Sequence, residues 1–485
     1  MKTLHIGNIA NNAYLNSKIL RATGSEAIVV SHDYTHIMGC PEWEDADIDG
    51  GVDQFNPDWG SVDLRGFVRP DWFVAGSASE CLARIGKLGG SGPNPNGSVV
   101  EARSPRPMLH RVTVRLASAI RRSKFGVMAQ WANRVRNRAR RDVNVLLGPP
   151  LLSPMIEREL LQDGVLREDI LPYLGSIARW RDAISGFDVV IGYGTSGVYS
   201  MLAATVPYIC FEHGTIRSIP FEDSSLGRLC RATYRRASHT IVTNADAITS
   251  LQRLGIRDYT FIPHPVNEAM PPVRRHEALR SQLTRKLGCE FIAFHPSRQH
   301  WEPTARNPSL EKGNDIFIRG LALAQKRSSV RIGAVLVDWG ASVCASRKLI
   351  SELHLESCVE WIAPLPHLRM VDMILATDVV ADQFFLGAFG SLTPKALMLG
   401  KPVLLNLNEE LHRWAFPELP PVLNVKTPDE VADALLVMAT DRARALETGQ
   451  RGIAWYHRHH SNQLILERLG RVARTVAEAS KVFGT

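Results

Sequence analysis

The sequence predicts an α/β protein built from two Rossmann-like, doubly wound domains. Strand-like and helix-like segments alternate along most of the chain, which is typical of parallel sheets with crossover helices. The chain of 485 residues is also longer than the roughly 250–300 residues that one core supports. We therefore expect an N-terminal domain over 1–283, a C-terminal domain over 284–450 and a helical tail over 451–485.

The first half is expected to form one sheet with a long insertion. The stretch 40–100 is rich in Gly, Pro, Asp and Trp, and we interpret it as irregular structure. The expected strands lie at 3–7, 26–31, 187–191, 207–211 and 239–243.

The second half has a more regular pattern. Thr427 is a capping residue and Pro428 occupies the first turn of the helix that follows. The expected strands lie at 291–295, 331–337, 358–362, 378–382 and 402–405, and the expected helices at 314–326, 342–354, 367–376 and 391–399. We place the boundary between the halves around 268–288, where Met270-Pro271-Pro272 precedes a charged helix.

The composition narrows the class of protein. The seven cysteines are scattered and include no C-x-x-C pair, which indicates reduced thiols rather than a disulfide framework or a zinc site. No apolar run reaches the ~20 residues that cross a bilayer. The N-terminal segment also lacks the apolar stretch of a secretory signal. These features predict a cytoplasmic protein.

Positive charge is concentrated in one segment. Residues 103–141 hold twelve Lys or Arg and no Asp or Glu, whereas the whole chain carries a formal net charge of +8. Arginines recur there at helical spacing beside apolar residues, so we expect a basic helical insertion over about 100–145. It has two interpretations: peripheral binding to an anionic membrane at its inner face, or a basic wall beside a cleft. Nucleic acid is not an expected partner, because no stacking aromatics interleave the arginines.

The strongest motif follows the strand expected at 291–295. Arg298 lies in the loop after this strand, and Lys312-Gly313 leads into the next helix. A cation past a strand and a second one at the following helix start suit a diphosphate, whose charge needs partners. Further along, Gly387 and Gly390 precede a helix, where backbone N–H groups can approach an anion.

Taken in this order, the segments from about 291 to 406 resemble the donor-binding domain of family-4-like glycosyltransferases of the GT-B fold. The resemblance implies two domains that face each other across a cleft, with the last helix crossing back onto the N-domain. It also implies that the N-domain binds the acceptor and the C-domain a nucleotide sugar. The residues implied for the donor diphosphate are Arg298, Lys312, Gly390, Ser391 and Leu392, and those implied near the donor sugar or nucleotide are Ala363, Pro364, Leu365, Asp382, Gln383, Gly387, Phe389 and Lys395.

The sequence departs from this family at two positions. The family carries two glutamates eight residues apart, the first touching the donor sugar and the second the ribose, and here those positions are Gly387 and Lys395. A lysine is a flexible point charge that suits a phosphate or a carboxylate instead. Asp382 and Gln383 are candidates for the lost sugar contacts. Two outcomes remain open, a changed donor or a site without catalysis.

His213 is the candidate catalytic residue of the first half. It follows the strand expected at 207–211, and side chains at this end of a strand in an open α/β sheet point into the ligand crevice. The resemblance implies contact with the donor sugar or the acceptor, and a hydrogen-bonded structural histidine is the alternative. Gly7, Asn8 and Asn12 resemble the family's first loop, which borders the donor phosphate and the acceptor.

Three other motifs are weighed against less specific explanations. Residues 192–197 have the dinucleotide fingerprint G-x-G-x-x-G, with Glu212 some twenty residues on, but they lie in the middle of the domain. Asp47 and Asp49 form a D-x-D in an acidic insertion, so a solvated loop is expected rather than a metal site. The histidines at 457, 459 and 460 are expected on the surface.

The expected activity is transfer of a sugar from a nucleotide-diphosphate donor to a hydroxyl of a glycan or lipid-linked glycan. The resemblance implies retention of the anomeric configuration. Cations and helix N-termini would stabilise the departing diphosphate, so neither a metal ion nor a cofactor is expected. Three rival hypotheses are a non-catalytic nucleotide-sugar-binding protein, a GT-B-fold nucleotide-sugar epimerase and a nicotinamide-dependent enzyme.

Overall fold

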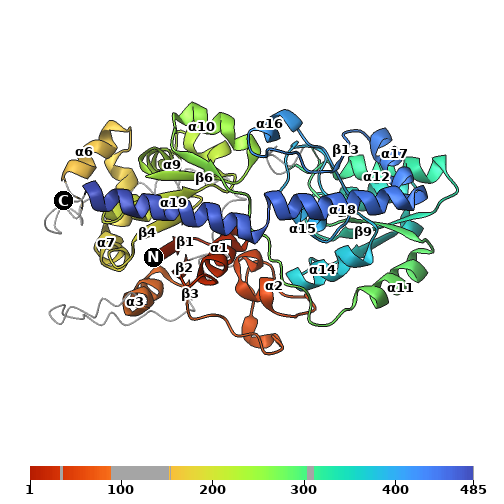
Figure 1. The fold of residues 1–485 in the computed structure, drawn as a ribbon, viewed down its shortest axis with the longest axis horizontal. Helices are drawn as coiled ribbons and strands as arrows, with labels where there is room; N and C mark the ends of the chain where they lie inside the picture. Colours follow the sequence, from red (N-terminus) through yellow and green to blue (C-terminus); the bar gives the residue numbers. More distant parts are fainter. Residues whose placement is uncertain (33–35, 89–151, 153, 303–310, 484–485) are drawn as a thin grey trace, which may run out of the picture.

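A computed structural model describes residues 1–32, 36–88, 152, 154–302 and 311–483. Two parallel sheets, one in each half of the chain, lie side by side (Figure 1). The expected α/β class with two Rossmann-like domains is confirmed. The basic segment 103–141 lies outside the described residues.

The N-terminal sheet has seven parallel strands in the order β3-β2-β1-β4-β5-β6-β7. Its central strands are nearly continuous apolar runs, because helices cover both faces of the sheet. The strands are β1 (Lys2–Ile6), β2 (Glu26–His32), β3 (Phe73–Gly76), β4 (Val189–Tyr193), β5 (Tyr208–Phe211), β6 (His239–Val242) and β7 (Tyr259–Phe261). The strand order reverses between β1 and β4, and ligands in such sheets bind beyond the carboxyl ends of the strands at this point.

The helices of the N-domain pack on both faces of this sheet (Figure 1). They are α1 (Asn12–Arg21), α2 (Pro41–Asp45), α3 (Ala78–Leu88), α6 (Pro154–Gln162), α7 (Arg167–Ile184), α8 (Val198–Ala203), α9 (Ser225–Arg236) and α10 (Ile248–Leu254). Short 3-10 turns lie at Ile9–Asn11, Ile37–Gly39, Trp59–Ser61, Thr215–Arg217, Ile219–Phe221 and Ala245–Ala247.

The C-terminal sheet has six parallel strands in the order β10-β9-β8-β11-β12-β13. They are β8 (Phe291–His295), β9 (Ile332–Val337), β10 (Val359–Ile362), β11 (Val379–Ala381), β12 (Val403–Leu405) and β13 (Leu423–Asn424). The helices are α11 (His276–Leu287), α12 (Asn314–Arg327), α13 (Val343–Glu352), α14 (His367–Ala376), α15 (Leu392–Met398), α16 (Glu409–Arg413) and α17 (Pro428–Thr440), with a 3-10 turn at Glu356–Cys358. Thr427 caps α17 as expected, since its side chain accepts a hydrogen bond from the N–H of Glu430.

The last two helices run along both domains in turn (Figure 1). Trp455 and Tyr456 of α18 (Arg442–His459) belong to the core of the C-domain, whereas Ile465 and Leu469 of α19 (Asn462–Phe483) belong to that of the N-domain. His460, between the two helices, is 2% exposed and its Nε2 donates to the backbone oxygen of His264. The expectation that His460 lies on the surface is therefore wrong.

Three strands were not expected, namely β3, β7 and β13. The stretch 40–100 is only partly irregular, because it contains α2, β3 and α3. Each missed strand has at most four residues, too short for a period-two pattern to stand out. β3 is an edge strand that pairs in parallel with β2.

An ionic cluster joins the loop after α2 to the C-domain. Asp47 accepts hydrogen bonds of 3.1 and 2.6 Å from Arg275, and its carboxylate lies 3.3 Å from Arg369 of α14. Asp49 pairs with Arg369 and with Arg65. The D-x-D is therefore part of an interdomain contact, and the expectation of a solvated loop is wrong for Asp47, whose side chain is 14% exposed.

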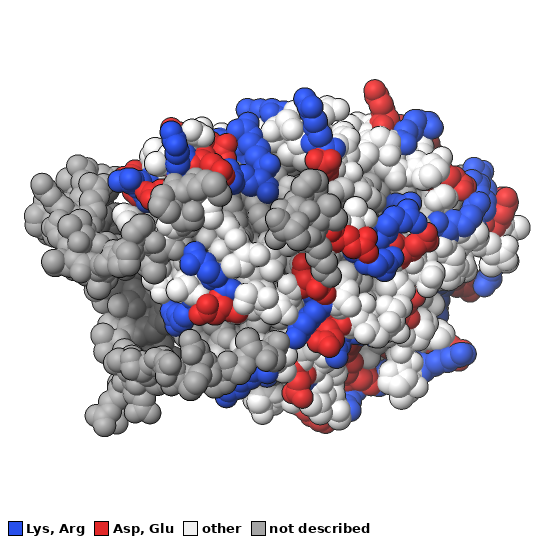
Figure 2. All heavy atoms as spheres, turned by 60° about the vertical axis from the view of Figure 1, so that its left-hand side comes forward, with Lys and Arg blue, Asp and Glu red and all other residues white. Residues whose placement is uncertain are grey.

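Basic and acidic side chains intermix over the described part of the face drawn in Figure 2. Within the described residues, no helix is both long enough and apolar enough to cross a membrane.

Candidate active site

A cavity of about 400 Å³ lies between the two domains. The N-domain contributes the start of α1 with the loop before it and residues on and near α2. The C-domain contributes the loops after β8, β9, β10 and β11 and the starts of α14 and α15. The chain between β7 and α11 lines it as well. The residues from the N-domain are Ala10, Asn12, Leu15, Met38, Trp43 and Glu44, and those expected from the C-terminal motifs are Arg298, Lys312, Leu365, Asp382, Ser391, Leu392 and Lys395.

Buried hydrogen bonds hold the loop after β8 in place. His295, at the end of β8, donates from Nδ1 to the backbone oxygen of Ala381 (2.9 Å), and its Nε2 accepts from Asn314 (2.8 Å). The Asn314 side chain in turn accepts from the N–H of His300 (2.9 Å), and the N–H of Lys312 donates to the His300 oxygen (2.7 Å). Both ends of the loop are therefore fixed against the sheet.

A glycine in the next loop allows the close approach of Arg298. Gly340, after β9, has a φ of +123°, a backbone conformation that residues other than glycine rarely adopt. A Cβ at this position would lie 2.8 Å from Cγ of Arg298. The N–H of Gln299 also donates to the oxygen of Trp339 (2.8 Å), and the Arg298 guanidinium lies 5.6 Å from the centre of the Trp339 ring.

Arg298 and Lys312 are cations without an anionic partner at ion-pair distance among the described residues. Nε of Arg298 is buried and has no hydrogen-bond partner there. Burial lowers the pKa of Arg298, and it also lowers that of Lys312 against the opposing charge of Asp382. A buried charge without a partner costs free energy. The pair is therefore suited to an anionic ligand.

Asp382 is an acidic group on the same wall. Its Oδ2 accepts from Thr393 (2.7 Å), and Ser297 donates to its backbone oxygen (2.5 Å). Burial raises the pKa of Asp382, and the hydrogen bond from Thr393 and the charge of Lys312 oppose this. The carboxylate is thus oriented by C-domain hydroxyls beside the two cations.

A second group of charges forms where the domains meet. Nζ of Lys395 donates to Nδ1 of His367 (2.7 Å), whose Nε2 donates to the oxygen of Ala269 (3.1 Å). Glu44 of the N-domain lies 3.6 Å from the same Nδ1. Burial lowers the pKa of Lys395 and raises that of Glu44, and each charge opposes the shift of the other. Lys395 therefore faces the cavity and an acidic group rather than solvent.

The remaining motif residues lie elsewhere. Gly387 borders a separate polar hollow beside Asn406 and Asn408, and Phe389 and Gly390 border a narrow crevice beside His264. Ala363, Pro364 and Gln383 are not among the residues that line the cavity. The Pro364 oxygen instead faces Gly50 of the N-domain, and Gln383 is 3% exposed with its backbone oxygen bonded to the N–H of Asn406.

His213 lies behind the cavity wall. Its ring centre is 5.2 Å from that of His264, whose Nδ1 donates to Oδ1 of Asn12 (3.1 Å). Nε2 of His213 is buried and has no hydrogen-bond partner among the described residues. Burial, and then the charge of His264, lower the pKa of His213 well below its usual value. Asn12 lines the cavity and His213 does not, so His213 lies behind His264 and Asn12 rather than at the cavity surface.

The other expected residues of the first loop, Gly7 and Asn8, line a pocket inside the N-domain. The Asn8 side chain is fully used in the fold, since it donates to Asn11 and to the Gly39 oxygen and accepts from the N–H of Tyr14. It therefore shapes this loop and has no free donor for a ligand.

The dinucleotide fingerprint has a structural use. A Cβ on Gly197 would lie 2.8 Å from Thr233, and Gly194 has a φ of +61°. The Glu212 carboxylate, which the fingerprint would assign to a ribose, accepts instead from the N–H of Gly214 and from Asn244. Close packing and a tight turn account for these glycines.

Sequence reasoning missed Glu44, His367, Trp339 and Asn267, all of which line the cavity. Glu44 lies in the stretch 40–100, which we interpreted as irregular. Without a regular helix or strand, the spacing of residues does not predict which side chains point toward a cavity. His367 follows Leu365-Pro366 at the start of α14, and a lone histidine there has no partner that the sequence could identify.

The fold and the cavity define a two-domain GT-B architecture. No protein-family model matches the chain, and no curated protein matches it. Solved structures do. Sucrose-phosphate synthase from Thermosynechococcus elongatus aligns over 99% of this chain and 100% of its own, with a TM-score of 0.55 and 14% identity.

A second similar structure is HepE from Anabaena in complex with UDP and glucose. It aligns over 63% of this chain and 83% of its own, with a TM-score of 0.51 and 18% identity. HepE in complex with UDP gives a TM-score of 0.50 at 20% identity, over 63% of this chain and 84% of its own. At these identities the likeness establishes the GT-B fold.

Proposed function

We propose that the protein is a glycosyltransferase that moves a sugar from a nucleotide-diphosphate donor to a hydroxyl acceptor. The observation that carries the proposal is the pair Arg298 and Lys312, two half-buried cations without an ionic partner among the described residues, on the wall of an interdomain cavity. The GT-B structures that resemble the chain include HepE in complex with UDP and glucose, which supports a nucleotide-sugar ligand.

In the proposed reaction, Arg298 and Lys312 bind the diphosphate and stabilise the charge that develops as it departs. Asp382 lies beside Lys312 and is oriented by Thr393, so it is placed to accept hydrogen bonds from donor hydroxyls. Glu44 and Lys395 close the cavity from opposite domains. In this proposal the two cations stabilise the negative charge of the departing diphosphate, so no divalent metal is required. The product retains the anomeric configuration of the donor.

A screen of nucleoside diphosphates and nucleotide sugars tests the proposal. Calorimetry with wild type should find a nucleoside diphosphate that binds, and Arg298→Ala and Lys312→Ala should each weaken it by about tenfold or more. A charge-assisted hydrogen bond is worth about 1.5–3 kcal/mol, and about 1.4 kcal/mol corresponds to tenfold. Arg331→Ala is the matched control, because Arg331 is exposed and lies outside the cavity. Equal affinity for all four folded proteins would contradict the diphosphate site.

Turnover separates the rival functions. Incubation with the bound nucleotide sugar and a glycan acceptor should release nucleoside diphosphate, also in the presence of EDTA, and NMR of the product should show the donor's anomeric configuration. Binding without turnover would indicate a non-catalytic nucleotide-sugar-binding protein, and an epimerised sugar with the nucleotide still attached would indicate an epimerase. A membrane surface and a lipid-linked acceptor stay predictions from the sequence, because residues 103–141 lie outside the described part of the chain.

A further inference from the structure

A pocket of about 280 Å³ lies inside the N-domain, separate from the interdomain cavity. It opens beyond the carboxyl ends of β1, β2 and β4, where the strand order reverses. Gly7, Asn8 and Ile9 line this pocket, whereas Ala10 and Asn12 of the same loop line the interdomain cavity. The loop is therefore a wall shared by the two.

Every described residue that lines this pocket is uncharged at neutral pH or is a histidine. The polar lining includes Ser31 and His32 at the end of β2 and Thr195 and Ser196 in the turn after β4, and the apolar lining includes Leu226 of α9. Binding an ionic ligand here would require burying its charge without a counter-charge among the described residues, which is costly. The lining thus favours a neutral ligand.

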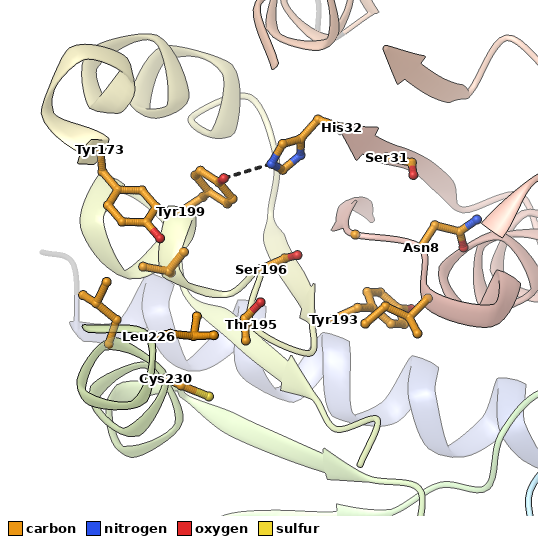
Figure 3. Close-up of a pocket in the computed structure, with 14 residues that line it drawn as sticks. Asn8, Ser31, His32, Tyr173, Tyr193, Thr195, Ser196, Tyr199, Leu226 and Cys230 are labelled. Atoms are coloured by element: carbon orange, nitrogen blue, oxygen red, sulfur yellow. Dashed lines mark hydrogen bonds between the residues drawn. The ribbon is translucent and has the colours of Figure 1, made fainter. Parts of the chain in front are cut away.

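One side of the pocket is an aromatic wall. Tyr199 stacks on Trp180 with ring centres 4.5 Å apart, meets the edge of Tyr173 at 5.7 Å, and hydrogen-bonds to Nε2 of His32 (2.9 Å). Because these contacts already hold the Tyr199 ring, a ligand does not have to order it. Figure 3 shows Tyr173 and Tyr199 on one side of the pocket, with Asn8 and Ser31 on the other.

Hydroxyl groups lie between the two sides. Thr195 and Ser196 are half-buried, and their hydroxyls make no hydrogen bond among the described residues (Figure 3). The Ser31 hydroxyl is buried and also has no partner there. The positive φ of Gly7 brings its backbone close to the Ser196 side chain. A ligand with several hydroxyls would satisfy these groups.

We propose that this pocket binds one uncharged sugar ring, with Thr195 and Ser196 contacting its hydroxyls and Tyr173 and Tyr199 its C–H face. A pyranose has both an apolar face and a rim of hydroxyls, as the lining requires. The volume is just below the roughly 300–1,000 Å³ of pockets for drug-sized ligands, so it suits a single ring. That this ring belongs to the acceptor rests on the proposed function, because the shared loop places it next to the donor cavity.

The test measures sugar binding directly, without nucleotide. Saturation-transfer NMR with methyl glucoside and methyl galactoside should show saturable binding to wild type, and methyl glucuronide should bind at least threefold more weakly. Thr195→Val and Tyr173→Ala should weaken the neutral glycoside by about threefold to tenfold, as for one hydrogen bond or one aromatic contact. Thr195→Ser and Tyr173→Phe are the matched controls and should stay within about twofold.

Three results would overturn the inference: no binding of either neutral glycoside to wild type, equal binding of methyl glucuronide, or unchanged binding in Thr195→Val and Tyr173→Ala. Preferential binding of 1-octanol would also overturn it and assign the pocket to an apolar chain. Nucleoside diphosphate affinity of the same variants, by calorimetry, should equal that of wild type. Failure of nucleotide binding in wild type would contradict the proposed function and leave the sugar pocket standing.

Discussion

Nζ of Lys395 lies 2.7 Å from Nδ1 of His367, with Glu44 of the other domain 3.6 Å from the same nitrogen. His367 is neutral in this arrangement, because burial and then the charge of Lys395 lower its pKa well below the usual value. Lys395 is thus the cation that balances Glu44 across the domain interface. Lys395 and Glu44 come from different domains, so their charges face each other only in the folded chain.

Removing the charge of Lys395 alone should lower the free energy of unfolding more than removing the charges of Lys395 and Glu44 together. Lys395→Met leaves Glu44 buried without its cation, so we expect the free energy of unfolding to fall by about 3 kcal/mol. Glu44→Gln together with Lys395→Met should recover at least about 1 kcal/mol, because no uncompensated charge remains. Chemical denaturation measures both, with Lys348→Met as the control because Lys348 is exposed on α13. Strictly additive effects would show that Lys395 and Glu44 do not interact.

Substitution of Asp47 should weaken the contact between the domains more than substitution of Asp49. Burial alone would raise the pKa of Asp47, but the hydrogen bond from Arg275 and the charge of Arg369 outweigh it and hold the pKa below its usual value. Asp47→Asn should destabilise the protein by about 1–3 kcal/mol, between the values for surface and buried pairs. Asp49 is 70% exposed, so Asp49→Asn should cost less than about 1 kcal/mol.

Thermal unfolding and small-angle scattering measure this contrast. Asp47→Asn should broaden the scattering-derived distance distribution, because it loosens a contact between the domains, and Asp49→Asn should leave it close to that of wild type. Equal behaviour of the two variants would mean that the cluster does not hold the domains together.

Buried histidines should make the protein sensitive to acid. Burial lowers the pKa of His5 and His460 to about 3 and that of His264 and His295 to about 4. In the unfolded chain each takes up a proton near pH 6.5. The unfolded state then binds more protons below this pH, so these groups lower the free energy of unfolding as the pH falls from about 6.5 toward 4.

A single variant isolates this contribution from that of Glu44, Glu212 and Asp382, whose raised pKa values act in the opposite sense. His460→Gln keeps a donor for the His264 oxygen and removes one titrating group. Its stability should depend less steeply on pH than that of wild type, by up to about 1.4 kcal/mol per pH unit between 6 and 4. Urea denaturation at several pH values measures the slopes, and identical slopes would refute the prediction.

Many of the helices and strands could be predicted from local patterns in the sequence. The strand at 291–295 and the helices starting at 314 and 428 agree with the structure, because apolar runs and caps act within a few residues. The short edge strands β3 and β13 could not be predicted from the sequence, since their stability comes from pairing with a neighbouring strand rather than from their own residues.

The sequence by itself determined the two parallel sheets and the two cations that flank the loop after β8, since both depend on residue types at close spacing along the chain. Only the tertiary structure decided which other residues line the same cavity as these cations. Glu44 and Lys395 are 351 positions apart. Thr195 and Ser31 line the same pocket because β1 pairs with β4 on one side and with β2 on the other. Burial and charge in both cavities depend on such distant neighbours. In the interdomain cavity they are set only when the two domains have packed, and in the N-domain pocket when β1, β2 and β4 have paired.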